Sequence, residues 1–113
     1  MALVLVLALV LPPPALGLEG ASPDPASLAS GGRLFEAHCV GCHINGGNII
    51  RRGKNLKLAT LQRNGIDDPA AIATIAAAGI GAMGGYGEAL GEGGPEAVGA
   101  WVWQQALEGW PRG

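Results

Sequence analysis

The chain has 113 residues, a formal charge of −2, and only five aromatic side chains (three Trp, one Tyr, one Phe) beside 20 glycines. This length accommodates one domain, and the mild negative charge argues against nucleic acid as a partner. Because so few bulky side chains are present, the core is small, and we expect a bound group to help fill it.

The first segment, MALVLVLALVLPPPALG (residues 1–17), carries no charged side chain. Its apolar run ends at Leu11 and is shorter than the roughly 20 residues that span a membrane. Ala15 and Gly17 resemble a signal-peptide cleavage site. We therefore predict a signal peptide over residues 1–17, a mature domain over residues 18–113, and no stable membrane insertion after cleavage. No Lys or Arg precedes the run, so either the true start lies upstream or the α-amino group alone supplies the positive end. A buried N-terminal strand or helix is the alternative to a signal peptide.

The remaining chain predicts an all-α domain, because no segment alternates cleanly between apolar and polar residues. Two Asp-Pro pairs mark helix starts, with a capping carboxylate followed by proline at the first helical position. Helices are expected over residues 25–38, 56–64, 69–78 and 95–108, with glycine following the last three. Residues 79–94, with glycine at eight of sixteen positions, are expected to form a long loop.

The segment Cys39-Val40-Gly41-Cys42-His43 matches the C-x-x-C-H pattern of covalent haem attachment. Its two sulfurs can reach the two vinyl groups on one porphyrin edge, and the following imidazole can reach the iron. A thioredoxin-like dithiol is disfavoured because no βαβ unit surrounds the motif. A zinc site is disfavoured because its only Cys and His candidates lie within residues 38–43, too close together for a tetrahedral site. A simple disulfide in an exported protein remains open.

Met83 is the candidate for a second iron ligand. It is the only methionine after Met1 and follows His43 by 83 − 43 = 40 positions, enough chain to wrap around a haem. A thioether is a soft, neutral ligand that raises the reduction potential of a His-ligated haem. If both axial positions are occupied, the iron has no vacancy for a substrate, so the predicted role is electron transfer.

Four segments together resemble cytochrome c6, a soluble class I c-type cytochrome: GGRLFEAHCVGCHINGGNII, LKLATLQRNGID, AIATIAAAGIGAMGGYG and AVGAWVWQQALEGW. The resemblance covers about residues 28–110. It implies a class I cytochrome c fold, with about four helices around one haem c attached through two thioethers. It also implies a contact between Gly31 and Trp101 where the first and last helices cross, and a hydrogen bond from Asn48 to a haem propionate or to neighbouring backbone.

The resemblance further implies a monomeric one-electron carrier rather than an enzyme, located in the thylakoid lumen or periplasm. Its redox partners would be the cytochrome bf complex and either photosystem I or a terminal oxidase. A haem sensor or peroxidase-like protein with a labile Met83 ligand is the alternative, and a haem-free disulfide-bonded domain is a third. The cluster of Arg51, Arg52, Lys54 and Lys57 could steer an acidic partner, neutralise propionates, or simply face solvent.

Three positions depart from the family pattern. Gly84 follows Met83 where proline is usual, and Gly87-Glu88-Ala89 lacks the cation that commonly helps docking on photosystem I. Ile75 stands eight positions before Met83, where many photosynthetic donors have a glutamine that touches the haem. An aliphatic residue there is associated in the family with a lower potential. These departures indicate a divergent branch whose partner need not be photosystem I.

Overall fold

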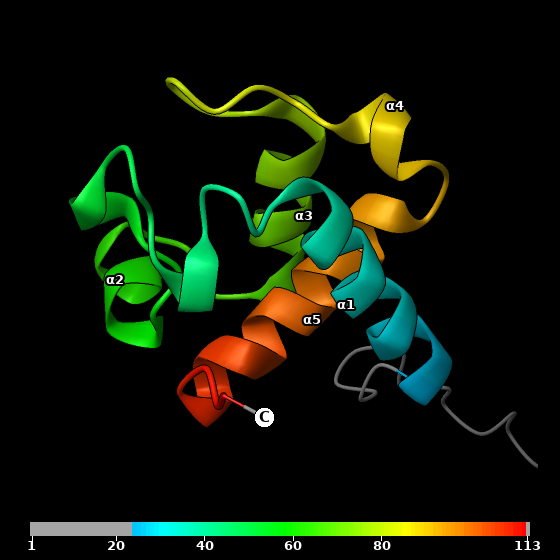
Figure 1. The fold of residues 1–113 in the computed structure, drawn as a ribbon, viewed down its shortest axis with the longest axis horizontal. Coiled ribbons are helices and arrows are strands. Elements are labelled where there is room, and N and C mark those ends of the chain that lie inside the picture. The colour runs from blue at the N-terminus through cyan, green and yellow to red at the C-terminus, as the bar shows by residue number, and fades with distance from the viewer. Residues whose placement is uncertain (1–23, 113) are drawn as a thin grey trace, which may run out of the picture.

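The computed structural model describes residues 24–112, so the predicted signal peptide (1–17) lies outside the described residues. The described chain is helical (Figure 1), and the all-α prediction is confirmed. Its elements are α1 (Pro25–His38), η1 (Ile44–Gly46), η2 (Arg52–Lys54), α2 (Leu58–Arg63), α3 (Pro69–Ala78), α4 (Gly87–Leu90) and α5 (Gly94–Glu108), where η denotes a short 3-10 helix.

The Asp-Pro pairs begin helices as predicted. The Asp24 carboxylate accepts a hydrogen bond from the Ser27 amide at 2.8 Å, and the Asp68 carboxylate accepts one from the Ala71 amide at 2.8 Å. Each bond satisfies an amide that the first helical turn leaves without a backbone partner. Gly109 ends α5 in the left-handed conformation, with φ 78.

The prediction of an unbroken loop over residues 79–94 is wrong at α4. This single turn buries Leu90, and it begins after Tyr86, whose amide donates to the Ala76 carbonyl at 2.8 Å. The helix is too short to show a periodic pattern in the sequence, and the flanking glycines concealed it. The described residues therefore form five α-helices rather than four.

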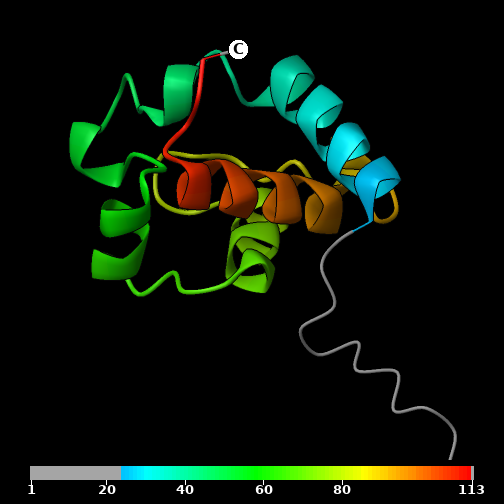
Figure 2. The ribbon, with the colours of Figure 1, turned by 90° about the horizontal axis from the view of Figure 1, so that it is seen from below.

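Helix α5 lies between α1 and α3 and packs against both (Figure 2). A Cβ atom on Gly31 would overlap the Ala97 carbonyl oxygen and lie 2.9 Å from the Trp101 Cβ atom. On the other side of α5, a Cβ atom on Gly99 would lie 2.5 Å from the Pro69 oxygen. Each glycine costs a helix about 1 kcal/mol relative to alanine, and here the cost is offset by close backbone approach. The crossing expected at Gly31 and Trp101 is present.

The core joins the three long helices to the C-terminal residues. Phe35 and two tryptophans form an aromatic cluster, with ring centroids 4.8 Å apart for Phe35 and Trp101 and 5.6 Å apart for Phe35 and Trp110. The buried apolar residues that pack together are Phe35, Leu61, Ile72, Ala76, Leu90, Val98, Val102, Ala106 and Trp110. Within residues 24–112, none of the helices has both the length and the apolar character needed to cross a bilayer.

Candidate haem site

A cavity of about 470 Å³ opens between the helical core and the loops that follow α1 and α3. Its volume lies in the roughly 300–1,000 Å³ range of ligand pockets. An adjoining cavity of about 120 Å³ shares four of its lining residues. Both cavities are lined by Cys39, His43, Asn48 and Met83, while Ile75 lines the larger and Cys42 the smaller. The structure thus gathers all six residues that the sequence assigned to the site.

His43 is held in one orientation and one tautomer. Its Nδ1 atom lies 2.7 Å from the carbonyl oxygen of Gly47. Because a carbonyl only accepts, Nδ1 must carry the proton, and the lone pair of the neutral ring is then on Nε2. This is the arrangement that metal-binding histidines use, since the backbone bond fixes the ring and makes the free nitrogen more basic.

Trp110 packs against the loop that follows His43. Gly46 has φ 77, and a Cβ atom there would lie 2.5 Å from the indole ring of Trp110. The indole Nε1 donates to the Leu56 carbonyl at 3.0 Å, and the Leu56 amide donates to the Gly46 carbonyl at 2.7 Å. No pattern in the sequence indicated this network, because Trp110 and Leu56 lie 54 positions apart in the chain.

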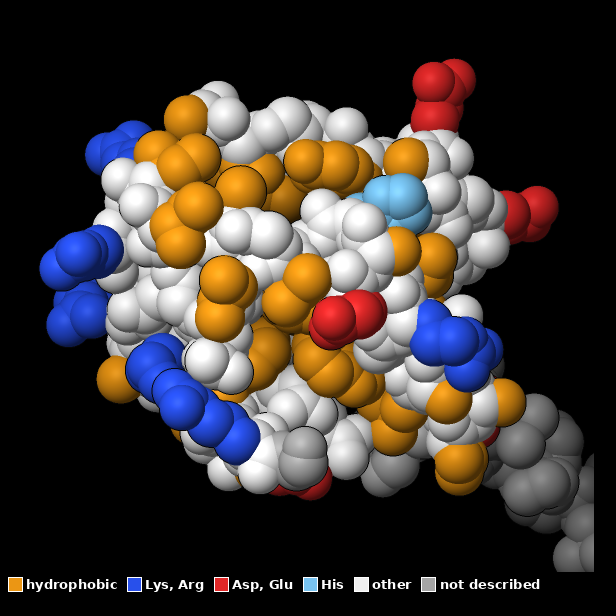
Figure 3. Space-filling view, viewed as in Figure 1, with side chains coloured by type: hydrophobic (Ala, Val, Ile, Leu, Met, Phe, Trp, Pro, Cys, Tyr) orange, Lys and Arg blue, Asp and Glu red, His pale blue; other side chains and the backbone are white. Residues whose placement is uncertain are grey.

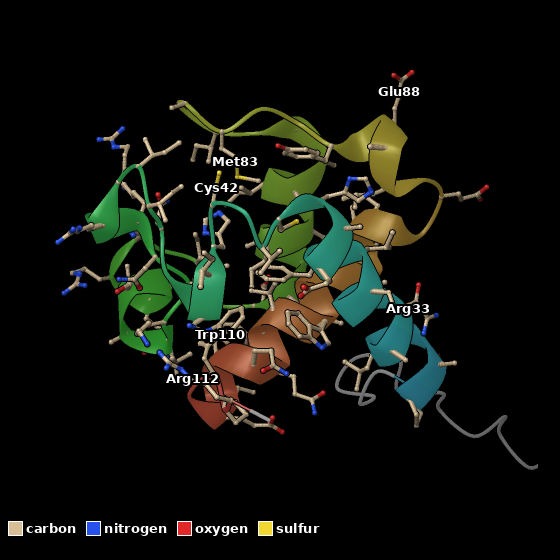
Figure 4. All side chains as sticks on the ribbon, viewed as in Figure 1. Arg33, Cys42, Met83, Glu88, Trp110 and Arg112 are labelled. Carbon is tan, nitrogen blue, oxygen red and sulfur yellow. The ribbon has the colours of Figure 1, made fainter. Side chains whose placement is uncertain are left out.

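The two cysteines follow directly on α1. Cys39 is the C-terminal cap of α1, and its amide donates to the Phe35 carbonyl at 2.8 Å. Cys39 is half-buried and Cys42 is exposed, and no disulfide joins the two. Burial raises the pKa of the Cys39 thiol, and repulsion from Cys42 raises it further. Figure 4 shows Cys42 beside Met83, consistent with their shared cavity.

Met83 is presented by a tight backbone turn. The Ile80 amide donates to the Met83 carbonyl at 3.0 Å, and the Met83 amide donates to the Ile80 carbonyl at 2.9 Å. Gly79, with φ 80, leads into this turn, and a Cβ atom there would lie 2.5 Å from the Met83 oxygen. Gly84 follows in open space, because a Cβ atom there would meet no other atom within 4 Å.

Asn48 shapes the polar side of the cavities. Its Oδ1 atom accepts from the amides of Ile50 at 3.0 Å and Arg51 at 2.7 Å, and its Nδ2 donates to the Lys54 carbonyl at 3.2 Å. Asn48 was expected to bond either a haem propionate or neighbouring backbone, and these bonds are to neighbouring backbone. Arg51 and Lys54 line the larger cavity, together with Asn55 and Asn64.

The residues around the cavities fit a haem. Phe35, Val98 and Val102 supply apolar walls, and the possible iron ligands are an imidazole nitrogen and a thioether sulfur, which suit haem iron. Neither lining contains an Asp or Glu, so the carboxylates that hard cations prefer are missing from the described walls. The two thiols beside His43 supply the covalent attachment points.

Comparison with known proteins identifies the family. The family model for cytochrome c oxidase, cbb3-type, subunit III matches residues 26–102. A cytochrome c6-like protein from Nostoc sp. (strain PCC 7120) is 47% identical over 81 residues, which is 72% of this chain and 73% of the relative. The chain belongs to the cytochrome c6 family. Proteins of this family are electron carriers with one covalently bound haem c.

Solved cytochrome c6 structures share the fold. Cytochrome c6B from Synechococcus sp. WH8102 is 60% identical, with a TM-score of 0.73 over 75% of this chain and 97% of the other. Oxidised cytochrome c6A from Arabidopsis thaliana is 32% identical, with a TM-score of 0.69 over 80% of this chain and 100% of the other. By contrast, a cytochrome c6 from Synechocystis sp. is 40% identical over 75% of this chain and 71% of its own length. The chain is thus more similar to the c6B variant than to that cytochrome c6, as expected for a divergent branch.

Proposed function

We propose that the protein is a soluble, monomeric one-electron carrier whose haem c is attached through Cys39 and Cys42 and bound axially by His43 and Met83. The main support is geometric. His43 and Met83, 40 positions apart in the sequence, line the same two adjoining cavities, and the bond between His43 Nδ1 and the Gly47 carbonyl leaves Nε2 free to bind a metal. When bound, the haem supplies a site that gains and loses one electron.

The surrounding residues adapt the site to that role. Phe35, Val98 and Val102 exclude water from the interior, and apolar burial is one of the properties that set haem potentials. Ile75 on α3 adds hydrocarbon where a glutamine is common in photosynthetic donors. Following the family pattern, we propose a lower potential than that of those donors.

Electrons would enter and leave at the smaller cavity. Cys42, Ala82 and Gly84 are exposed there and have small side chains, so a partner can approach the attached edge of the haem closely. We propose that the carrier is exported to the thylakoid lumen or periplasm. There it would serve the cytochrome bf complex and either photosystem I or a terminal oxidase.

Redox titration of the matured holoprotein, followed by electron-transfer rates to photosystem I and to a terminal oxidase, tests these assignments. A reversible one-electron potential with rapid transfer to either acceptor is expected. A colourless protein from cells competent in cytochrome c maturation would contradict the haem assignment. A potential well below that of the bf complex, with negligible photosystem I reduction, would remove only the photosynthetic partner.

A haem sensor or peroxidase-like protein is the second candidate, favoured by Gly84, which leaves the chain after Met83 without the restraint of the proline usual in the family. There the Met83 sulfur would leave the iron and free a coordination position. Carbon monoxide separates the two functions. The carrier predicts no carbon monoxide binding to the reduced protein at neutral pH, whereas a sensor predicts binding.

A further inference from the structure

The charged residues of the domain are strongly segregated. Five of the seven Lys and Arg residues lie within residues 51–63, and no Asp or Glu occurs between Glu36 and Asp67. All five side chains are exposed. We call this cluster the basic face; it consists of Arg51, Arg52, Lys54, Lys57 and Arg63. Figure 3 shows most of the basic side chains along one end of the molecule, whereas acidic side chains lie at the opposite end, in the middle of this face and at its lower edge. Figure 4 places Glu88 of α4 away from the basic end.

The basic face borders the haem cavities through one short loop. Asn48 fixes this loop through its bonds to the backbone of Ile50, Arg51 and Lys54. Arg51 and Lys54 thereby reach the rim of the larger cavity, and Ile50 reaches the rim of the smaller. The basic face is therefore continuous with the surface where the haem edge would be exposed.

Two isoleucines in the same loop face solvent. Ile49 is 65% exposed and Ile50 is 67% exposed, although isoleucine is among the residues most often buried. Ile50 lines the smaller cavity, and both isoleucines directly precede Arg51 and Arg52 in the chain, so the segment combines exposed apolar side chains with cations. Transient protein interfaces have this composition, with charges that steer the encounter and apolar atoms that hold it.

We propose that the basic face, with Ile49 and Ile50, is the docking surface for a redox partner protein whose own contact surface is acidic around an apolar centre. The inference rests on the proposed carrier function and specifies the partner of the same site. Glu88, at the far side of the cavities, would repel such a partner, so the charge pattern favours one docked orientation. In the family, docking cations commonly follow the Met loop, whereas here they precede it in the chain.

An anionic membrane would also attract a basic face. The isoleucines nevertheless belong to a loop at the cavity rim, rather than to the long amphipathic helix typical of interfacial binding. A lipid surface accepts no electron, so placing the exposed haem edge against it would serve no transfer. These observations favour a protein partner.

Stopped-flow reduction of the oxidised holoprotein by a pre-reduced acidic [2Fe–2S] ferredoxin, which gives up one electron to the haem, is followed over a series of salt concentrations and tests the proposal. The low potential of this ferredoxin class gives a large driving force, so the rate reports the encounter. Arg52→Glu reverses a charge on the basic face without touching either cavity lining. Arg33→Glu on α1 is the matched control, with the same change in net charge at an exposed site away from the basic face (Figure 4).

The proposal predicts that Arg52→Glu lowers the second-order rate constant about tenfold at low salt and that the difference disappears at high salt. Arg33→Glu should change the rate constant less than about twofold, because a rim charge acts through local steering. Ile49→Ser should lower the rate constant at both low and high salt, because its contact is not electrostatic.

Equal rate losses in Arg52→Glu and Arg33→Glu would overturn the docking surface, since net charge alone would then explain them. Arg52-dependent retention on phosphatidylglycerol vesicles, with an unchanged ferredoxin rate, would overturn it in favour of a membrane. Reduction by dithionite and reoxidation by hexacyanoferrate keep the two proposals separate. Failure of the wild type to cycle between these reagents would refute the carrier function itself. Normal cycling, with ferredoxin rate constants that the substitutions leave unchanged, would refute only the docking surface.

Discussion

The two sides of the haem site are built differently. On the His43 side, a side-chain hydrogen bond to Gly47 fixes the imidazole, and buried Trp110 packs against the loop and bonds to the Leu56 carbonyl. On the Met83 side, the turn is closed by a pair of backbone hydrogen bonds to Ile80 and is surrounded by glycines. His43 is thus positioned by tertiary packing, and Met83 by local backbone geometry.

This difference implies that the two proposed axial bonds, from His43 and from Met83, break at different free-energy costs. Displacing His43 would disturb the aromatic core, whereas displacing Met83 requires only a short, glycine-rich segment to open. Segments with few packed side chains open at lower free energy than the global unfolding. We expect Met83 to leave the iron under conditions in which the rest of the fold persists.

The largest expected effect is that of Trp110→Ala, which removes the support of the His43 side. Loss of this ring should lower the free energy of unfolding by about 3–5 kcal/mol, measured by guanidinium unfolding of the holoprotein. Trp110→Phe is the matched variant, because it keeps an aromatic ring but loses the bond to Leu56, and it should cost about 1–3 kcal/mol. A small loss of unfolding free energy in Trp110→Ala would show that Trp110 does not stabilise the His43 side.

On the Met83 side, Gly79→Ala should remove iron–methionine bonding while leaving the helices folded. Its backbone, at φ 80 and ψ 170, costs an L-residue roughly 1–3 kcal/mol, and the new Cβ atom would also collide with the Met83 backbone. Gly91→Ala is the control, because it carries the same strain at φ 75 and ψ 178, has no neighbour within 4 Å and lines neither cavity. The weak far-red absorbance band of the iron–methionine bond should disappear in Gly79→Ala and persist in Gly91→Ala. Equal behaviour of the two variants would indicate that close packing at Gly79 does not position Met83.

Asn48→Ala should weaken the His43 side without affecting Met83. The variant loses three hydrogen bonds to the loop over residues 50–54, but water can replace them at this exposed position. We expect a loss of about 0.5–1.5 kcal/mol in the free energy of unfolding. The far-red band should keep its wild-type intensity, and its loss would show that the two sides are coupled through this loop.

The smallest effect is a stabilisation at Gly84. Gly84→Ala restricts the unfolded chain. Gly84 does not have a positive φ, and the new Cβ atom would have no protein neighbour within 4 Å. Such changes typically gain about 0.4–1 kcal/mol. The far-red band should therefore persist to a higher guanidinium concentration than in the wild type. An unchanged midpoint for the band would show that chain entropy does not limit the opening of this loop.

How far the sequence predicted the structure depended on the range of the interaction. The helix starts at Asp24 and Asp68 were predictable because capping involves only neighbouring residues. His43 was predictable as a site residue because the haem motif is contiguous in sequence. The contact between Trp110 and Leu56 was missed, since it joins segments with no shared period. The α4 turn was missed because four residues among glycines give no helical signal. The resemblance to cytochrome c6 supplied the Gly31 crossing, which composition alone did not reveal.

The electronic spectrum of the oxidised, matured holoprotein at neutral pH tests the central claim most directly, namely that His43 and Met83 bind one covalently held haem from opposite sides. The account predicts a low-spin haem with the far-red band of an iron–methionine bond, and loss of that band in Met83→Ala. A wild-type spectrum without the band, or one that Met83→Ala leaves unchanged, would contradict it.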